Sequence, residues 1–414
     1  MTDIERLADR AKTASREIPK LPEEKKNAAL RAISEALRAA TDVILAANGE
    51  DMAAAEKAGT SPAMLDRLKL TAARIESMAD GVDQVAALPD PTGKILERTV
   101  RPNGLVIEKI SVPIGVVGII YEARPNVTAD AAALCFKSGN AVVLRGGKEA
   151  VRSSAAIARV MREALSTQGI PADCVCFVED TSRDSAKEMM GLVGRLDVLI
   201  PRGGAGLIRS VVENSRVPVI ETGVGVCHVY VEKTADLEMA AQIIKNAKCS
   251  RPSVCNAAEC LLVDKEIAVK FLPMAAEALA EYKVELRGDE ETRRVLPEAK
   301  AALPEDYDTE FLDYILAVKT VTGLDEAIAF IAAHGTGHSE AIVTRDDACA
   351  ERFLREVDAA AVYVNASTRF TDGGEFGLGA ELGISTQKLH ARGPMGLAEL
   401  TSSKYLIRGT GQIR

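Results

Sequence analysis

Residues 115–147 read GVVGIIYEARPNVTADAAALCFKSGNAVVLRGG: an apolar strand, a turn containing proline, a helix and a second apolar strand. The alternation continues with apolar runs at 175–178 and 198–200 and helical patterns near 153–165 and 182–192. Strands that alternate with helices form parallel βαβ units with helices on both faces of the sheet. The stretch therefore predicts a doubly wound α/β domain.

The segments before and after residues 115–147 also show helix and strand patterns. Residues 2–88 are rich in Ala, Leu, Glu, Lys and Arg with apolar residues at helical spacing, which predicts a helical layer. Pro89, Pro91 and Gly93 end this layer, and short β-rich runs follow it. Further apolar runs predict a second α/β domain, with strands at 227–231, 261–263, 314–318, 339–344 and 361–365.

Length and charge narrow the class of protein. A chain of 414 residues exceeds what one core usually fills, so two or three domains are expected. The net charge of −9 argues against nucleic acid as the main partner. The amino terminus does not resemble a secretory signal and no apolar run is long enough to span a membrane, so we expect a cytoplasmic protein with reduced thiols.

No metal site is expected. The eight cysteines contain no CxxC pair, and the histidines are scattered. His334 and His338 stand four apart, but Gly335 and Gly337 interrupt the helix that would align them.

One cysteine stands out as a candidate nucleophile. Cys255 lies in a polar turn of small residues before the apolar run 260–263, with Lys248 and Arg251 close in sequence, where a thiolate could be stabilised. Burial is the commoner fate of a free cysteine, so from local sequence alone a structural role is about equally probable. Cys249 is ambiguous. The remaining cysteines lie in apolar or alternating patterns and are assigned to packing: Cys135, Cys174, Cys176, Cys227, Cys260 and Cys349.

Three glycine loops are candidate phosphate cradles. The loop with Gly203 and Gly204 follows a strand and opens a helix, so free backbone N–H groups and a positive helix end face any anion there. The loop 145–149 sets Arg145 and Lys148 beside two glycines. The loop 221–225 sets a carboxylate before glycines that permit close backbone approach. Each loop can instead be an ordinary turn.

Asn126 follows a buried strand where Pro125 interrupts regular structure. Its amide could donate to a developing oxyanion. The alternative role is to cap the helix that runs through Asp130.

Together these residues resemble the aldehyde dehydrogenase superfamily along nearly the whole chain, and within it the members that act on γ-glutamyl phosphate. The stretches that carry the resemblance are Pro113–Val116, Tyr121–Thr128, Ser138–Gly147, Glu221–Gly225, Arg251–Ala257 and Thr371–Thr386.

The resemblance implies an NADPH-dependent reduction of L-glutamate 5-phosphate to glutamate 5-semialdehyde, a step of proline biosynthesis. It implies that the Cys255 thiolate attacks the acyl phosphate and that the thioester then accepts hydride. The Asn126 amide and the Cys255 backbone N–H would hold the oxyanions.

The resemblance also implies cofactor residues. Glu310 matches the glutamate that binds the nicotinamide ribose. The family's adenosine-binding Lys-Pro-x-Glu is replaced here by Arg145-Gly146-Gly147-Lys148, and Lys148 would attract a 2′-phosphate, so NADP(H) is expected over NAD(H). Glu221 keeps the carboxylate of the family's hydrolytic base, but its loop differs (Glu221-Thr222-Gly223-Val224), and a reaction with phosphate needs no activated water.

Cations must bind the substrate's carboxylate and phosphate. We expect Arg124, Arg251 and Arg369 in this role, with His228 and Arg392 behind them. The alternative for each is an ordinary surface charge.

The resemblance implies three parts: an NADP-binding domain at 1–99 and 123–224, a catalytic domain at 225–391, and a small β arm at 100–122 and 392–414 that mediates oligomerisation. Exposed strand edges of such an arm require pairing. A homo-oligomer, dimer or tetramer, is therefore expected.

Two other functions remain open. A related dehydrogenase could take aspartyl or succinyl chains, and a catalytically silent member could serve as a scaffold. The chain begins directly with dehydrogenase-like helices, so its acyl phosphate is expected from a separate glutamate 5-kinase. The sequence leaves open whether the two proteins associate.

Overall fold

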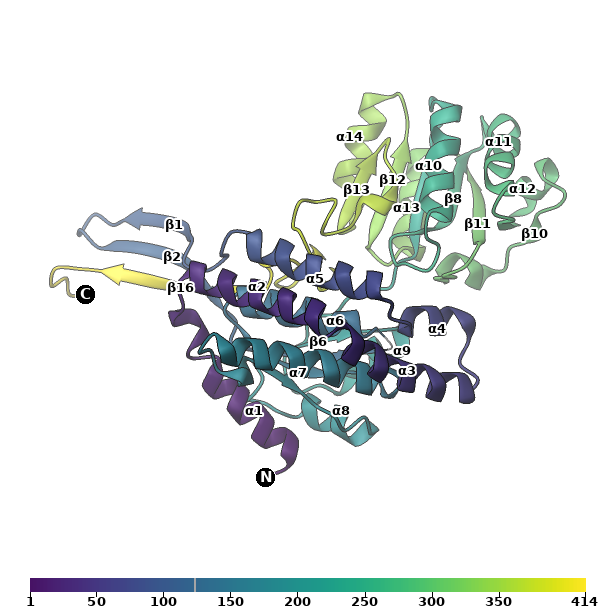
Figure 1. The fold of residues 1–414 in the computed structure, drawn as a ribbon. Coiled ribbons are helices and arrows are strands. Elements are labelled where there is room, and N and C mark those ends of the chain that lie inside the picture. The colour runs from purple at the N-terminus through teal and green to yellow at the C-terminus, as the bar shows by residue number, and fades with distance from the viewer. Residues whose placement is uncertain (123) are drawn as a thin grey trace. The chain divides into compact units, whose positions relative to one another are not determined.

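The computed structural model describes residues 1–122 and 124–414, without the side chains of Pro62 and Ala63. The chain forms two compact units (Figure 1). The first comprises residues 1–222, 377–383 and 395–414, and the second comprises residues 223–376 and 384–394. Ala123, within one of the stretches that carry the family resemblance, lies outside the described residues.

A four-stranded parallel sheet forms the centre of the first unit, in the order β5-β4-β3-β6. The strands are β3 (Val116–Tyr121), β4 (Ala141–Arg145), β5 (Val175–Phe177) and β6 (Val198–Arg202). Every residue of β3 is buried, as expected of a central parallel strand. The connecting helices are α6 (Asn126–Lys137), α7 (Val151–Thr167) and α8 (Arg183–Met190), and α9 (Ala205–Asn214) follows β6.

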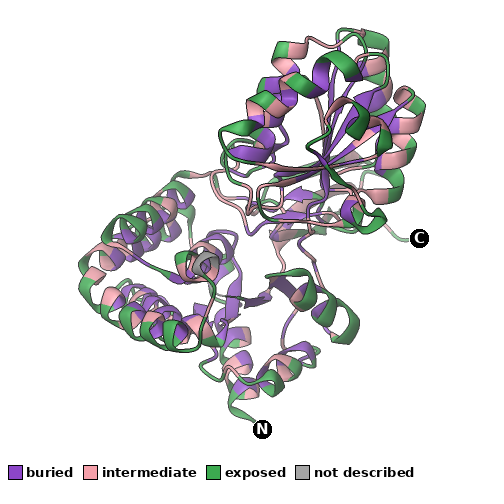
Figure 2. Cartoon of the chain, turned by 90° about the vertical axis from the view of Figure 1, so that its right-hand side faces the viewer, coloured by how far each residue is buried: buried purple, intermediate pink, exposed green. Residues whose placement is uncertain are grey.

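The predicted helical layer at the amino terminus is confirmed. It consists of α1 (Asp3–Ala14), α2 (Glu23–Ala39), α3 (Thr41–Lys57), α4 (Pro62–Leu68) and α5 (Ala72–Ala87). The helix α2 packs against α5 and α7. An ion pair joins Lys26 Nζ of α2, which is buried, to half-buried Asp90 Oδ2 at 2.7 Å. In Figure 2 these helices show one buried and one exposed face.

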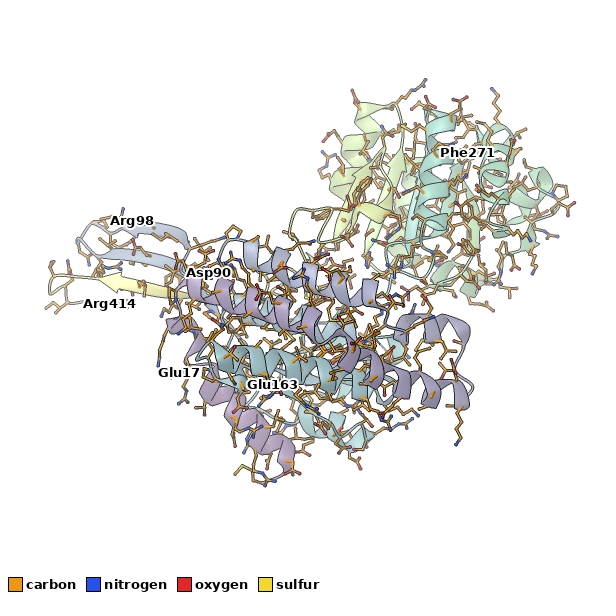
Figure 3. All side chains as sticks on the ribbon, viewed as in Figure 1. Glu17, Asp90, Arg98, Glu163, Phe271 and Arg414 are labelled. Carbon is orange, nitrogen blue, oxygen red and sulfur yellow. The ribbon has the colours of Figure 1, made fainter. Side chains whose placement is uncertain are left out.

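A separate antiparallel sheet, here called the arm, has the order β1-β2-β16. Its strands are β1 (Ile95–Val100), β2 (Val106–Pro113) and β16 (Thr401–Arg408). Arg98 and Arg414, labelled in Figure 3, lie on this part of the chain. The predicted arm boundaries of 100–122 and 392–414 were wrong, because residues 116–121 form β3 in the buried parallel sheet and β1 begins before residue 100.

The second unit contains a seven-stranded parallel sheet in the order β10-β9-β11-β8-β7-β12-β13. The strands are β7 (Cys227–Val231), β8 (Ala258–Asp264), β9 (Glu285–Gly288), β10 (Lys300–Ala301), β11 (Ile315–Val321), β12 (Ser339–Val343) and β13 (Ala361–Val364). All five predicted strands are present. The strands β9 and β10 were not predicted from the sequence; they are short and largely exposed or half-buried.

Helices cover both faces of this sheet: α10 (Leu237–Cys249), α11 (Ala268–Ala280), α12 (Glu290–Val295), α13 (Leu324–His334) and α14 (Asp347–Glu356). Successive strand residues point to opposite faces. Leu261 therefore packs in a core with Phe271 of α11, labelled in Figure 3, while Leu262 packs in another core with Phe353 of α14. The predicted fold, with two doubly wound α/β domains, is confirmed.

Short elements complete the chain. They are the 3₁₀ turns Ile18–Lys20, Lys148–Ala150, Ala172–Cys174, Pro304–Asp308 and Thr368–Phe370, and the strands β14 (Ile384–Ser385) and β15 (Gly393–Pro394). The predicted catalytic domain at 225–391 differs from the second unit, because residues 377–383 pack within the first unit and 392–394 within the second.

Among the described helices none is long and apolar enough to cross a bilayer.

Candidate active site

In the first unit, the carboxyl ends of β3 and β6 form the point where the strand order reverses. The chain runs from β3 outward through β4 to β5 and then returns to the other side of β3 as β6. Ligands of doubly wound sheets bind at such a switch point. Glu122 follows β3 and Gly203 follows β6, so both lie at this crevice.

The loop before α9 already accommodates an anionic group. The Gly204 N–H donates to Glu122 Oε2 at 2.9 Å, and a Cβ on Gly203 would lie 2.6 Å from the same oxygen. The first N–H groups of a helix lack partners within the helix and favour negative charge. Gly203 and Gly204 are exposed. This loop therefore has the donors that a pyrophosphate requires.

Arg145 and Lys148 lie in different environments. Arg145 Nη2 donates to the carbonyl oxygens of Thr181 and Ser182 at 2.7 and 2.8 Å, so its guanidinium supports the start of α8. Burial lowers the pKa of Arg145. Lys148 is exposed on its 3₁₀ turn, which leaves it accessible to a cofactor phosphate.

Asn126 is exposed in the first turn of α6, where Pro125 occupies the N-cap position and no side chain caps the helix. The capping role considered for Asn126 is therefore wrong. Its Nδ2 donates to Asp130 Oδ2 at 3.0 Å, four residues along the same helical face. Burial raises the pKa of Asp130 to about 6, against the opposing effect of Asn126 and of the positive charge of Arg202. One amide N–H is thus oriented by Asp130, and an amide carries two.

In the second unit, three loops enter the neighbouring strands β11, β8 and β7 from the same edge of the sheet. Cys255 lies before β8, on the turn that follows α10, and Pro252 within that turn prevents the helix from continuing. Gly225 lies before β7, and Glu310 lies before β11. Because the strands are parallel, the starts of all three meet at one edge.

The three loops are in contact at Gly225. A Cβ on Gly225 would lie 1.5 Å from the backbone oxygen of Cys255, so only glycine fits this position. The Gly225 N–H donates to Glu310 Oε1 at 2.8 Å. Cys227, which the sequence assigned to packing alone, donates its Sγ–H to the Cys255 carbonyl at 3.2 Å. Half-buried Cys255 and Glu310 are therefore held against the same short backbone segment.

Two arginines accompany the cysteine turn. Arg369 Nε donates to Ser250 Oγ at 3.0 Å, and its Nη1 donates to Asn256 Oδ1. Burial and then the like charge of exposed Arg251 lower the pKa of Arg369, while Cys255 acts in the opposite direction. Arg251, Arg369 and Cys255 thus lie within electrostatic range of one another.

Two cations do not have the roles expected of them. His228 is fully buried in β7, and its Nδ1 lies 2.9 Å from Glu340 Oε2. Burial alone would lower the pKa of His228, but the Glu340 carboxylate raises it. His228 was expected among the cations that bind substrate, but in the structure its side chain is fully buried and paired with a carboxylate. Lys248 is also buried, and its ammonium pairs with the Glu259 carboxylate.

The remaining candidates divide between the units. Arg124, half-buried before α6, and half-buried Glu221 belong to the first unit. Gly223 begins the second unit, where its N–H donates to the Ile384 carbonyl at 2.8 Å. Arg392 pairs with Asp358 at 2.8 Å. Among the described residues, no group of His, Cys, Asp or Glu side chains has the arrangement of a metal site.

Comparisons with known proteins agree with this fold. The pattern described as "Aldehyde dehydrogenase family" matches residues 1–297. Gamma-glutamyl phosphate reductase of Carboxydothermus hydrogenoformans is 63% identical over 414 residues, with 100% of both chains covered. The enzyme of that name from Caldanaerobacter subterraneus is 56% identical, again with 100% of both chains covered.

Solved structures give the same result. The crystal structure of gamma-glutamyl phosphate reductase from Thermotoga maritima superposes with a TM-score of 0.96 at 47% identity, covering 99% of each chain. An acetylating aldehyde dehydrogenase from Geobacillus thermoglucosidasius shares the fold, with a TM-score of 0.71 at 19% identity and 100% of both chains covered.

Proposed function

Because the chain belongs to the aldehyde dehydrogenase family, among the gamma-glutamyl phosphate reductases, we propose that it reduces L-glutamate 5-phosphate to L-glutamate 5-semialdehyde and phosphate with NADPH. This is an oxidoreductase step of proline biosynthesis. The observation that carries the proposal is the contact of the Cys255 turn and Glu310 with one glycine, Gly225.

Cys255 is the proposed nucleophile. Its thiolate attacks the acyl carbon of the substrate, the C–O bond to phosphate breaks, and a thioester to Cys255 Sγ remains. Hydride addition to the thioester carbon gives a tetrahedral oxyanion, and its collapse releases the aldehyde and the thiolate. Both steps pass through oxyanions, for which the Asn126 amide and the Cys255 backbone N–H are the proposed donors. A donor of this kind contributes about 3 kcal/mol to transition-state stabilisation.

Several residues suit NADP(H), which when bound supplies the hydride. The N–H groups before α9, where Glu122 now lies, would hold the pyrophosphate, and Glu310 would hold the nicotinamide ribose. Exposed Lys148 would pair with the 2′-phosphate. Arg145 contributes indirectly, because its guanidinium is engaged by backbone carbonyls.

Arg251 and Arg369 are the proposed partners of the substrate phosphate. Two like charges near each other are unfavourable unless an anion lies between them, and a phosphate group is such an anion. Arg124 is proposed for the substrate carboxylate. Glu221 is not needed as a base, since no water is activated.

A second copy of the chain is the proposed partner of the arm. Among the residues that the structure describes, no strand pairs with the outer edges of β1 and β16, and these strands expose the apolar side chains of Ile95, Leu96, Val100, Tyr405 and Ile407. Exposed strand edges with apolar side chains favour pairing with another chain. We propose a cytoplasmic homo-oligomer.

The test runs the reaction backwards, with glutamate 5-semialdehyde and NADP⁺, with and without phosphate, for native protein and Cys255→Ser. Phosphate-dependent NADPH formation that disappears in the variant supports the proposal. Turnover without phosphate would indicate a hydrolytic dehydrogenase with Glu221 as base. No turnover would favour another substrate or a silent scaffold.

A further inference from the structure

A buried ion pair closes the base of the turn that carries Cys255. Lys248 Nζ, in the last turn of α10, lies 2.5 Å from Glu259 Oε2 in β8. Their side chains are 0% and 1% exposed. The pair therefore fixes where the nucleophile turn leaves α10 and where it enters the sheet.

The second oxygen of the same carboxylate reaches the loop of Glu310. Glu259 Oε1 accepts a hydrogen bond from the Leu312 N–H at 3.2 Å. Leu312 has φ +55°, a left-handed conformation that is unfavourable for a leucine and persists only where its surroundings hold it. Glu310, two residues earlier, accepts the hydrogen bond from Gly225.

The ring of Phe311 adds contacts to the same loop. Lys248 Nζ lies 6.0 Å from the ring centroid, and the Arg287 guanidinium lies 5.2 Å from it. Arg287 Nη1 in turn donates to Asp306 Oδ1 at 2.7 Å, which ties down the 3₁₀ turn before the loop. Two cations, Lys248 and Arg287, thus lie over the ring of Phe311, the residue between Glu310 and Leu312.

A gain in stability alone does not explain why Lys248 and Glu259 form a buried ion pair here. Two charges removed from water lose their hydration, and a well-packed apolar pair of similar size is often as stable. An apolar pair could not accept the Leu312 N–H, however. What the carboxylate adds is a hydrogen bond to the cofactor loop.

We propose that Glu259, held by Lys248, is a positioning residue that joins the nucleophile turn to the Glu310 loop and so sets Glu310 relative to Cys255. The inference rests on the proposed function, in which Glu310 binds the nicotinamide ribose. Its consequence is that NADP(H) binding depends on a residue that the cofactor does not touch.

The test compares Glu259→Leu with the double variant Lys248→Met/Glu259→Leu, measuring the melting temperature and the KM values for NADP⁺ and semialdehyde. The single change leaves a buried unpaired ammonium, so the melting temperature falls; the double change restores it. The KM for NADP⁺ rises about tenfold in both, and the KM for semialdehyde changes less than twofold. A double variant that recovers the native NADP⁺ KM would overturn the proposal, because only stability would then be at stake.

Two further variants keep the result interpretable if Glu259→Leu does not fold. Glu259→Gln keeps the shape of the side chain, and its effect on the KM for NADP⁺ is measured alone and combined with Glu310→Gln. If Glu259 acts through Glu310, it adds less than twofold once Glu310 is changed. Fully multiplicative effects would contradict this route. If Glu310→Gln alone leaves the KM unchanged, the role of Glu310 fails and this inference with it, while phosphate-dependent turnover by Cys255 stands.

The control is Asp90→Asn, which removes the negative charge that pairs with buried Lys26 in the first unit. It is expected to lower the melting temperature without changing the KM for NADP⁺. An equal rise in that KM would mean that general destabilisation, and not Glu259, explains the effect.

Discussion

Replacing Gly225 with alanine is expected to disable the nucleophile while leaving the fold of each unit intact. The added Cβ would lie 1.5 Å from the Cys255 carbonyl oxygen, whereas real Cβ contacts essentially never fall below 3.0 Å. The obstacle is backbone, so no flexible side chain can move aside. The Cys255 turn must retreat by at least about 1.5 Å.

The size of the effect follows from this displacement. A misplacement of about 1 Å between reacting groups can lower the rate on the order of 10²-fold. We therefore expect Gly225→Ala to lose at least about 100-fold in kcat/KM for phosphate-dependent semialdehyde oxidation. The rate at which iodoacetamide alkylates Cys255, measured by mass spectrometry, is also expected to differ between this variant and the native protein.

Gly49→Ala is the matched control. Gly49 lies in α3, and a Cβ there would meet nothing within 4 Å. Alanine in a helix is favoured over glycine by about 1 kcal/mol, so this variant should be fully active and slightly more stable. Activity of Gly225→Ala within threefold of the native value would refute the reasoning about the Cys255 turn.

Three other perturbations test separate parts of the site. As pH falls through about 6, protonation of Asp130 removes its negative charge and weakens the hydrogen bond that orients Asn126, so kcat should fall on the acid side in native protein. A pH–rate profile of Asp130→Asn should lack that limb. Lys148→Glu should raise the KM for NADP⁺ at least about tenfold, with little change for NAD⁺, in steady-state kinetics. Ile407→Glu, on the exposed arm strand β16, should yield smaller particles by light scattering if the arm joins two copies.

Local patterns predicted the fold well because strand and helix periods are properties of neighbouring residues. The arm boundary was the exception. Residues 116–121 and 106–113 are both β-rich, and only their burial separates them: β3 is wholly buried, while β2 is mostly half-buried. Burial depends on what packs against a strand, which sequence spacing does not reveal.

At the site, too, local sequence patterns do not reveal contacts between residues that are distant along the chain. Cys255 was found because its turn is local, but the contacts around it join distant residues: Cys227 and Cys255 are 28 positions apart, and Gly225 and Glu310 are 85 positions apart. From the sequence, His228 and Lys248 were candidate cations for the site. In the structure both are buried, and each is paired with a buried carboxylate. Asp130 could have been found, since it stands four residues after Asn126 on a predicted helix.

The most direct measurement is a burst experiment without phosphate. Native protein is mixed with glutamate 5-semialdehyde and NADP⁺, NADPH is followed by absorbance, and the protein mass is recorded. The account predicts one NADPH per active site, a glutamyl thioester on Cys255, and renewed turnover when phosphate is added. Continuous NADPH formation without phosphate, or an acyl group on any other residue, would contradict it.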